Sequence, residues 1–272
     1  MNNDLGSPGN PRHGPSINRL IPNVLTVAAL CSGLTAIRFG LQDQFKLAVI
    51  AIIVASIFDS LDGRVARRLG VTSRFGAELD SLSDFLCFGV APALVLYLAA
   101  LKDGGALGWV VTLMFPICSA LRLARFNTAL ISDTPPPAWT GSFFTGVPAP
   151  AGALLALIPL VMSFEVESRW PRHPLIVGGV MVLIGGLMVS RLPTFSFKRG
   201  RVPRHLVLPA LLGVALAMGL VAASPWIGLS LLGLLYASLI PFGWRAYRKQ
   251  EAAQAAQAKA AAASGTTTPP LT

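Results

Sequence analysis

Long apolar runs separated by short polar stretches dominate the chain from residue 24 onward. Each run has about 17–24 residues, a length with which an α-helix can cross the hydrocarbon core of a bilayer. The runs cover residues 24–41, 45–66, 77–100, 107–126, 146–164, 174–190, 205–223 and 226–243. This pattern predicts an all-α integral membrane protein with several spans.

The two ends of the chain depart from this pattern. Residues 1–15 are rich in Gly, Pro and Asn and are expected to be disordered. No signal peptide is expected, because the first apolar run begins too late. Residues 16–25 (SINRLIPNVL) are amphipathic, which predicts a short N-terminal helix at the membrane interface. Residues 246–272 are rich in Ala, Gln and Lys and then in Ser, Thr and Pro, as expected of a polar tail.

Composition and charge support a membrane protein. The chain has 272 residues, of which 53% are hydrophobic and only 12% are charged, whereas a soluble domain has about 25% charged residues. The net charge of +10 has a simple explanation in basic cytoplasmic loops. No nucleic-acid partner is therefore expected.

The distribution of Lys and Arg predicts the topology. If the N-terminus is cytoplasmic, only five of the 22 basic residues lie on the opposite side: Arg38, Lys46, Lys102, Arg169 and Arg172. Positive residues are enriched in cytoplasmic loops. Both termini are therefore expected in the cytoplasm, and the absence of a targeting peptide suits the inner membrane of a bacterium.

Residues 58–84 (FDSLDGRVARRLGVTSRFGAELDSLSD) are the polar exception between two apolar flanks. Asp59 and Asp62 are three residues apart, and Asp80 and Asp84 are four apart, so each pair shares one face of a helix. A short turn at residues 70–73 would bring all four carboxylates together at membrane depth. Charge in that environment is costly and usually marks function.

Four carboxylates favour a hard cation such as Mg²⁺, Mn²⁺ or Ca²⁺, whereas zinc would require His or Cys, which this stretch lacks. The arginines between the two pairs can neutralise phosphate charge, and the small Gly and Ala residues let a ligand approach the backbone. The residues alone therefore indicate a site for a metal and a diphosphate at a membrane surface. The alternative is a pair of helix ends with solvated charges.

The spacing of these residues resembles the signature of the CDP-alcohol phosphatidyltransferase family. It is Asp59-x2-Asp62-Gly63-x2-Ala66-Arg67-x8-Gly76-x3-Asp80-x3-Asp84. Members of the family transfer a phosphatidyl or related phospho group from a CDP-linked donor to an alcohol and release CMP. The resemblance implies that Asp59, Asp62, Asp80 and Asp84 bind Mg²⁺ or Mn²⁺. It also implies that Asp84 is the catalytic base that accepts the proton of the acceptor hydroxyl.

The same resemblance implies a binding site for the donor, CDP-diacylglycerol. Family members often begin their first span with Pro-Asn-x-x-Thr, which residues 22–26 match. A proline that simply begins a helix is the alternative explanation. The implied donor contacts are Pro22, Asn23, Asp62, Gly63, Ala66, Arg67, Ser73 and Gly76.

Two further motifs concern the acceptor. RLARFN at residues 122–127 and FxGxPxP at residues 144–150 are similar to the phosphatidylserine synthase branch of the family. This similarity implies L-serine as acceptor, with Arg122, Arg125 and Asn127 as acceptor-binding residues. On spacing alone, the two arginines are equally well explained as positive residues that anchor a helix end on the cytoplasmic side.

The resemblance also divides the chain. It implies a membrane core of six helices at residues 16–190, to which residues 191–245 add a transmembrane hairpin before the polar tail. Family members are commonly homodimers, so a homodimer surrounded by membrane lipid is expected.

Three alternative functions stay open on the sequence. The chemistry could be the same with glycerol 3-phosphate, inositol phosphate or choline as acceptor. An intramembrane prenyltransferase also uses aspartates, a metal and a diphosphate, although its motifs lie on widely separated segments. A cation transporter could use Asp59 to Asp84 as an ion path, but would have no need of CDP.

Overall fold

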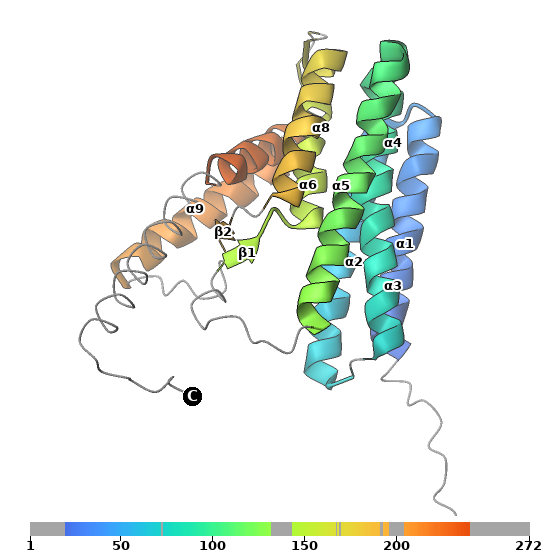
Figure 1. Cartoon of the computed structure of the whole chain (residues 1–272). Helices are drawn as coiled ribbons and strands as arrows, with labels where there is room; N and C mark the ends of the chain where they lie inside the picture. The colour runs from blue at the N-terminus through green and yellow to red at the C-terminus, as the bar shows by residue number, and fades with distance from the viewer. Residues whose placement is uncertain are drawn as a thin grey trace, which may run out of the picture.

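The computed structural model in Figure 1 describes residues 20–71, 73–131, 143–166, 168, 170–190, 193–195 and 204–239. Most of these residues are helical, as predicted. The elements are α1 (Leu20–Leu41), α2 (Phe45–Leu69), α3 (Arg74–Asp84), the π-helix η2 (Phe85–Val90), α4 (Ala91–Leu96), the π-helix η3 (Tyr97–Leu101), the 3₁₀ turn η4 (Lys102–Gly104), α5 (Gly105–Ile131), β1 (Phe143–Thr145), α6 (Ala149–Ala156), α7 (Ile158–Met162), the 3₁₀ turn η6 (Trp170–Arg172), α8 (Pro174–Val189), β2 (Pro193–Phe195) and α9 (Arg204–Ala223). A further helix covers Pro225–Leu239.

The first four apolar runs correspond to the helices on the right of Figure 1. Residues 24–41 lie in α1, residues 45–66 in α2 and residues 107–126 in α5. Residues 77–100 lie in a continuous helical stretch that begins with α3 and ends with η3. The separate interfacial helix expected at residues 16–25 is not seen in the described part of the chain, because residues 20–25 form the first turns of α1. The remainder of that segment, residues 1–15 and residues 246–272 lie outside the described residues.

The later runs are less regular than expected. The run at residues 146–164 is divided into α6 and α7, which meet at Leu157. Pro159 stands at the second position of α7, where its missing N–H breaks the hydrogen-bond ladder. Residues 174–190 correspond to α8 and residues 205–223 to α9. The run at 226–243 is helical through Leu239 and then leaves the described residues.

Two short strands accompany the helices, and the described part of the chain stays consistent with the all-α prediction. β1 and β2 pair antiparallel, with Phe143 opposite Phe195 and Thr145 opposite Pro193. The strands have three residues each and join the segment before α6 to the segment after α8. In the view of Figure 1 this small sheet is drawn to the left of α5.

By length and composition, two described helical stretches could cross a bilayer: Leu20–Leu41 and an apolar part of Arg74–Thr128. The shorter apolar helices are Pro174–Val189, Val207–Ala223 and Pro225–Leu239. These helices are consistent with a membrane protein, while the number of spans stays a prediction.

Small residues on one face of α1 let this helix pack closely against its neighbours. Its buried residues recur every three or four positions and are mostly small: Pro22, Thr26, Ala29, Gly33, Ala36 and Gly40. A Cβ at Gly33 would lie 2.6 Å from Cys87 Sγ and 3.2 Å from Cys87 Cα, so only glycine allows α1 to approach η2 this closely. The Cys87 thiol donates a hydrogen bond to the Ala29 carbonyl at 3.2 Å. This contact fixes the middle of α1 against η2, which follows α3 directly in the chain.

The turn between α2 and α3 is formed as predicted. Gly70 ends α2 in the left-handed conformation at φ 63°, which glycine adopts without strain, and Val71 N donates to the Ala66 carbonyl at 3.1 Å. Ser73 caps α3, because its Oγ accepts a hydrogen bond from Gly76 N at 3.0 Å. The short connection therefore lets the aspartates of the two helices meet.

Gly146 is a second glycine with a defined conformational role. It lies between β1 and α6 at φ 80°, and a Cβ there would lie 2.7 Å from the Met188 carbonyl oxygen and 3.0 Å from the Ser190 carbonyl oxygen. Alanine would therefore be strained in its backbone and would collide with the end of α8. Local geometry is therefore sufficient to explain the glycine of FxGxPxP.

We expect Gly146→Ala to destabilise the protein by about 2 kcal/mol, which corresponds to a melting temperature about 4–8 °C lower. Tryptophan fluorescence during heating in detergent measures this change. Gly179→Ala is the matched control, because Gly179 lies in α8 with no atom within 4 Å of the added Cβ. Equal melting temperatures for the two variants would contradict the account.

Candidate active site

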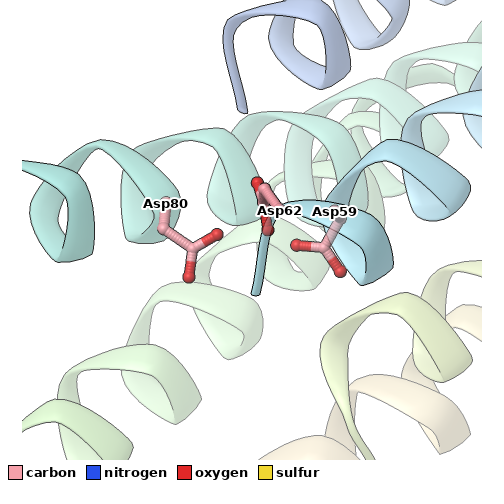
Figure 2. Close-up of side chains that lie close together, drawn as sticks. All are labelled: Asp59, Asp62 and Asp80. Carbon is pink, nitrogen blue, oxygen red and sulfur yellow. The ribbon is translucent and has the colours of Figure 1, made fainter. Parts of the chain in front are cut away.

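Three aspartates from two helices converge at one point. Asp59 and Asp62 come from the last turns of α2, and Asp80 comes from α3. One carboxylate oxygen of each lies within 4.8 Å of the others. Figure 2 shows the three side chains directed toward a common space between the helices. The helical spacing and the turn at Gly70 therefore produce the convergence that the sequence predicts.

This donor set fits a divalent cation. Three carboxylates at this separation repel one another unless a positive group lies among them, and Asp62 is only 5% exposed. Oxygen ligands from carboxylates are the preferred ligands of Mg²⁺ and Mn²⁺. Asp59, Asp62 and Asp80 are therefore the residues that would hold such an ion.

Asp84 lies beside this cluster and is not one of its three members. It ends α3, and its carboxyl is close enough to that of Asp59 for a side-chain hydrogen bond. Its Oδ1 is buried and has no hydrogen-bond partner among the described residues. An oxygen in this position can serve as a further metal ligand or accept a proton from a bound substrate.

A cleft of about 190 Å³ opens next to the aspartates. All eight residues predicted to contact the donor line it, together with Asp80. The lining consists of Pro22, Asn23, Thr26, Asp62, Gly63, Ala66, Arg67, Val71, Ser73, Gly76, Ala77 and Asp80. Residues from the start of α1, the end of α2 and the start of α3 are thus brought to one surface.

The glycines shape this cleft. A Cβ at Gly76 would lie 3.0 Å from Asn23 Oδ1 and 3.1 Å from Ser73 Oγ, so the starts of α1 and α3 meet closely at this point. Arg67 folds back over Gly63, and its Nη1 lies 3.4 Å from where a Cβ of residue 63 would be. The cleft therefore presents an exposed guanidinium beside the carboxylate cluster.

Thr26 is a site residue that the sequence reasoning did not identify. It is buried, and its Oγ1 lies 2.7 Å from Asp62 Oδ2 and 3.1 Å from the Pro22 carbonyl oxygen. A hydroxyl has one proton to donate, and the shorter distance favours the carboxylate. Thr26 thereby orients Asp62 toward the cluster. Its place in Pro-Asn-x-x-Thr was the available signal, but only the fold shows that Asp62 is the partner.

We expect Thr26→Val, which keeps the shape and removes the hydroxyl, to weaken Mn²⁺ binding by about tenfold, since groups that orient metal ligands have effects of this size. Titration calorimetry with MnCl₂ measures the affinity. Thr112→Val is the control, because Thr112 is equally buried but donates only to the Gly108 carbonyl at 2.7 Å. The same loss in both variants would refute a specific role for Thr26.

The three residues expected to bind the acceptor lie in different surroundings. Arg122, on α5, is half-buried and interacts electrostatically with Asp84. Arg125 is exposed and donates to the Val189 carbonyl at the end of α8 at 2.6 Å. Asn127 donates to Ser81 Oγ on α3 at 3.0 Å. The structure thus brings Arg122 to the aspartates, whereas Arg125 and Asn127 connect α5 to its neighbouring helices.

Comparison with protein families gives two matches. A family model described as CDP-alcohol phosphatidyltransferase matches residues 19–190. A second, described as CDP-alcohol phosphatidyltransferase 2, matches residues 205–241. The second match includes the helix Pro225–Leu239, which the resemblance found from the sequence did not cover.

Three curated relatives are similar over most of the chain, and each is named CDP-diacylglycerol–serine O-phosphatidyltransferase. The protein of Mycobacterium leprae is 40% identical over 85% of this chain and 77% of its own length. That of Mycobacterium tuberculosis is 39% identical over 88% of this chain and 84% of its own length. That of Helicobacter pylori is 34% identical over 78% of this chain and 88% of its own length.

Proposed function

Because the chain belongs to the CDP-alcohol phosphatidyltransferase family, we propose that it transfers the phosphatidyl group of CDP-diacylglycerol to the hydroxyl of L-serine. The products are phosphatidylserine and CMP, so the reaction is a step of phospholipid biosynthesis. The observation that carries this proposal is the convergence of Asp59, Asp62 and Asp80 beside a cleft lined by all the expected donor contacts. The printed names of the relatives support serine as acceptor.

Asp59, Asp62 and Asp80 would hold Mg²⁺ or Mn²⁺ at the membrane surface, and Asp84 would serve as a further ligand. When bound, the ion supplies positive charge that polarises the donor diphosphate and stabilises the phosphate of the departing CMP. Thr26 keeps Asp62 oriented for this role through its hydrogen bond.

The cleft binds the CDP part of the donor. Arg67 contributes a guanidinium that neutralises phosphate charge and offers several N–H donors. Gly63, Ala66 and Gly76 leave room for the diphosphate to approach the helix backbones. Pro22, Asn23 and Ser73 form the end of the cleft where α1 and α3 begin, and they contact the nucleotide there.

Asp84 accepts the proton of the serine hydroxyl. The serine oxygen attacks the phosphorus that carries diacylglycerol, a new O–P bond forms, and the P–O bond to CMP breaks. The free buried Oδ1 of Asp84 supports this role, because it has no partner to displace. Arg122 binds the serine carboxylate next to Asp84. Arg125 and Asn127 hold the end of α5 in place, so that Arg122 faces the site.

The remaining features of the proposal concern the membrane. The protein is multi-pass, with the site and both termini in the cytoplasm of a bacterial cell, where serine and CDP-diacylglycerol are available. The family core covers residues 16–190, and residues 191–245 add two spans. The protein is a homodimer in the lipid bilayer. The excess of basic residues on the site's side supports this orientation.

CMP release by the purified protein in detergent tests the proposed function. The assay contains CDP-diacylglycerol and MnCl₂ or MgCl₂, with L-serine, glycerol 3-phosphate, inositol phosphate or choline offered in turn. We expect CMP release with serine alone and none after chelation with EDTA. Release with a different alcohol would keep the role of the aspartates and overturn the acceptor. No release with any acceptor from a folded, metal-bound protein would refute the proposal.

A further inference from the structure

Two basic residues that lie far apart in the chain meet at one aromatic ring, at the end of α2 opposite the aspartates. Lys46, at the start of α2, has its Nζ 5.8 Å from the centroid of the Phe164 ring. Arg172, in the turn η6, has its Cζ 5.7 Å from the same centroid and 5.6 Å from that of Phe45. Aromatic faces attract cations, so the rings hold the two side chains together as a cation pair, Lys46 and Arg172.

A hydrogen bond fixes the orientation of the Arg172 guanidinium. Its Nε donates to Ser163 Oγ at 2.7 Å, and that hydroxyl donates in turn to the Leu160 carbonyl at 2.6 Å. The two Nη atoms of Arg172 donate to no residue that the structure describes. The half-buried guanidinium is therefore held in place with its terminal N–H fork available, and this fork matches the oxygens of a phosphate.

The cation pair has no counter-charge of its own. Neither Lys46 nor Arg172 forms an ion pair with a carboxylate in the described part of the chain. Two positive charges at one ring repel each other. Both also belong to the five basic residues on the side where the predicted topology leaves few of them. An anion bound between the two side chains would offset their repulsion.

The surroundings of the cation pair favour an anion with an apolar part. Phe164 meets Trp226 edge-to-face, with ring centroids 4.9 Å apart, and tryptophan is typical of the membrane–water interface. Large apolar side chains close in the chain to these residues are exposed: Leu47, Val166, Trp170, Leu175 and Ile227. The surface thus combines positive charge with exposed apolar side chains, as a phospholipid requires.

The cation pair is separate from the candidate active site. Phe45 and Asp59 stand at opposite parts of α2, and the rise of a helix puts about 21 Å between them. None of the residues of the cation pair and its rings lines the cleft at the aspartates. A lipid bound here would therefore be a second lipid, distinct from the donor.

We infer that Lys46 and Arg172 bind the headgroup of an anionic phospholipid at the end of the helices opposite the active site. The Nη fork of Arg172 binds two oxygens of the lipid phosphate, and Lys46 contributes a further positive charge. The exposed apolar side chains contact the acyl chains. This inference does not depend on the proposed reaction, because no step of that reaction involves the cation pair.

Lys46→Gln tests the inference. The purified protein in non-ionic detergent is mixed with phosphatidylglycerol or with phosphatidylcholine of the same acyl chains, and bound lipid is quantified by native mass spectrometry. We expect wild-type protein to bind phosphatidylglycerol more tightly than the uncharged-overall phosphatidylcholine. Lys46→Gln should weaken phosphatidylglycerol binding about fivefold, and Lys46→Gln with Arg172→Gln about 25-fold.

Lys102→Gln is the matched control. Lys102 is an exposed lysine that the predicted topology places on the same side, in the turn η4. Its loss removes the same charge and should leave phosphatidylglycerol affinity unchanged. Lys46 is also exposed, so Lys46→Gln should keep the wild-type melting temperature and isolates the effect of charge. Arg172→Gln additionally removes the bond to Ser163, so the single Lys46 variant decides the outcome.

Three results would overturn the inference. One is equal affinity of wild-type protein for the two lipids, and another is an equal effect of Lys46→Gln and Lys102→Gln. The third is displacement of phosphatidylglycerol by an excess of sodium phosphate, which would identify a free anion as the occupant. Absence of serine-dependent CMP release would refute only the proposed function, because lipid binding is measured without turnover.

Discussion

Replacing Asp84 by asparagine should reduce serine-dependent CMP release by about 1000-fold. Asparagine keeps the size of the side chain but cannot accept the hydroxyl proton as a carboxylate does. The buried Oδ1 of Asp84 has no hydrogen-bond partner among the described residues, so an amide group at that position breaks no hydrogen bond of this oxygen. Steady-state rates and CDP-diacylglycerol affinity, measured side by side in detergent, separate catalysis from binding.

The affinity of Asp84→Asn for the donor should stay within about threefold of wild type, since the cleft does not include residue 84. Asp103→Asn provides the control, because Asp103 is an exposed carboxylate in the turn η4. It should retain wild-type turnover. Turnover of Asp84→Asn near the wild-type level would rule out Asp84 as the base.

Replacing Asp59 by alanine should abolish tight metal binding. Loss of a group that merely orients a metal ligand weakens affinity by about 10- to 100-fold, so loss of a ligand should weaken Mn²⁺ affinity by at least about 100-fold. Because three carboxylates within 4.8 Å repel one another, the same change should raise the melting temperature measured in EDTA. The gain in melting temperature on adding MnCl₂ should disappear.

Glu78→Ala is the control for this experiment. Glu78 is an exposed acidic residue of α3, only two positions from Asp80, but it is not a member of the cluster. Its removal should leave Mn²⁺ affinity and metal-dependent stabilisation unchanged. If Asp59→Ala bound Mn²⁺ as tightly as Glu78→Ala, the assignment of the metal site would be wrong.

Much of the site could be predicted because its geometry is local. Helical periodicity places Asp59 beside Asp62, and Gly70 and Ser73 mark where one helix ends and the next begins. The turn is short, so the last turns of α2 and the first turns of α3 lie near each other. The cleft residues of α2 and α3 follow from the same stretch of sequence.

The features that were missed depend on contacts between distant segments. The partner of Thr26 is Asp62, on the next helix, and no local pattern identifies it. RLARFN places two arginines on one helix face, yet Arg125 binds the end of α8, whereas Arg122 interacts electrostatically with Asp84. The short strands β1 and β2 form because segments on either side of α6 and α8 meet, which hydropathy does not reveal.

The interruption of the fifth apolar run has a different cause. Hydropathy gives the length of an apolar run but does not show where its helix is interrupted. Here α6 and α7 are separated at Leu157, and Pro159 has no N–H to continue the hydrogen-bond ladder. The extra helix Pro225–Leu239 was expected as a span, but its contact with the core through Tyr236 required the fold. Prediction from sequence was therefore most reliable where spacing along one helix determined the contacts.

The most direct test of the central claim is to follow labelled serine into lipid. Purified protein is mixed with CDP-diacylglycerol, MnCl₂ and ¹⁴C-labelled L-serine, and labelled phosphatidylserine and CMP are quantified over time. The account predicts equal amounts of the two products from wild-type protein and neither product from Asp84→Asn. CMP formed without labelled phosphatidylserine, or equal yields from both proteins, would contradict it.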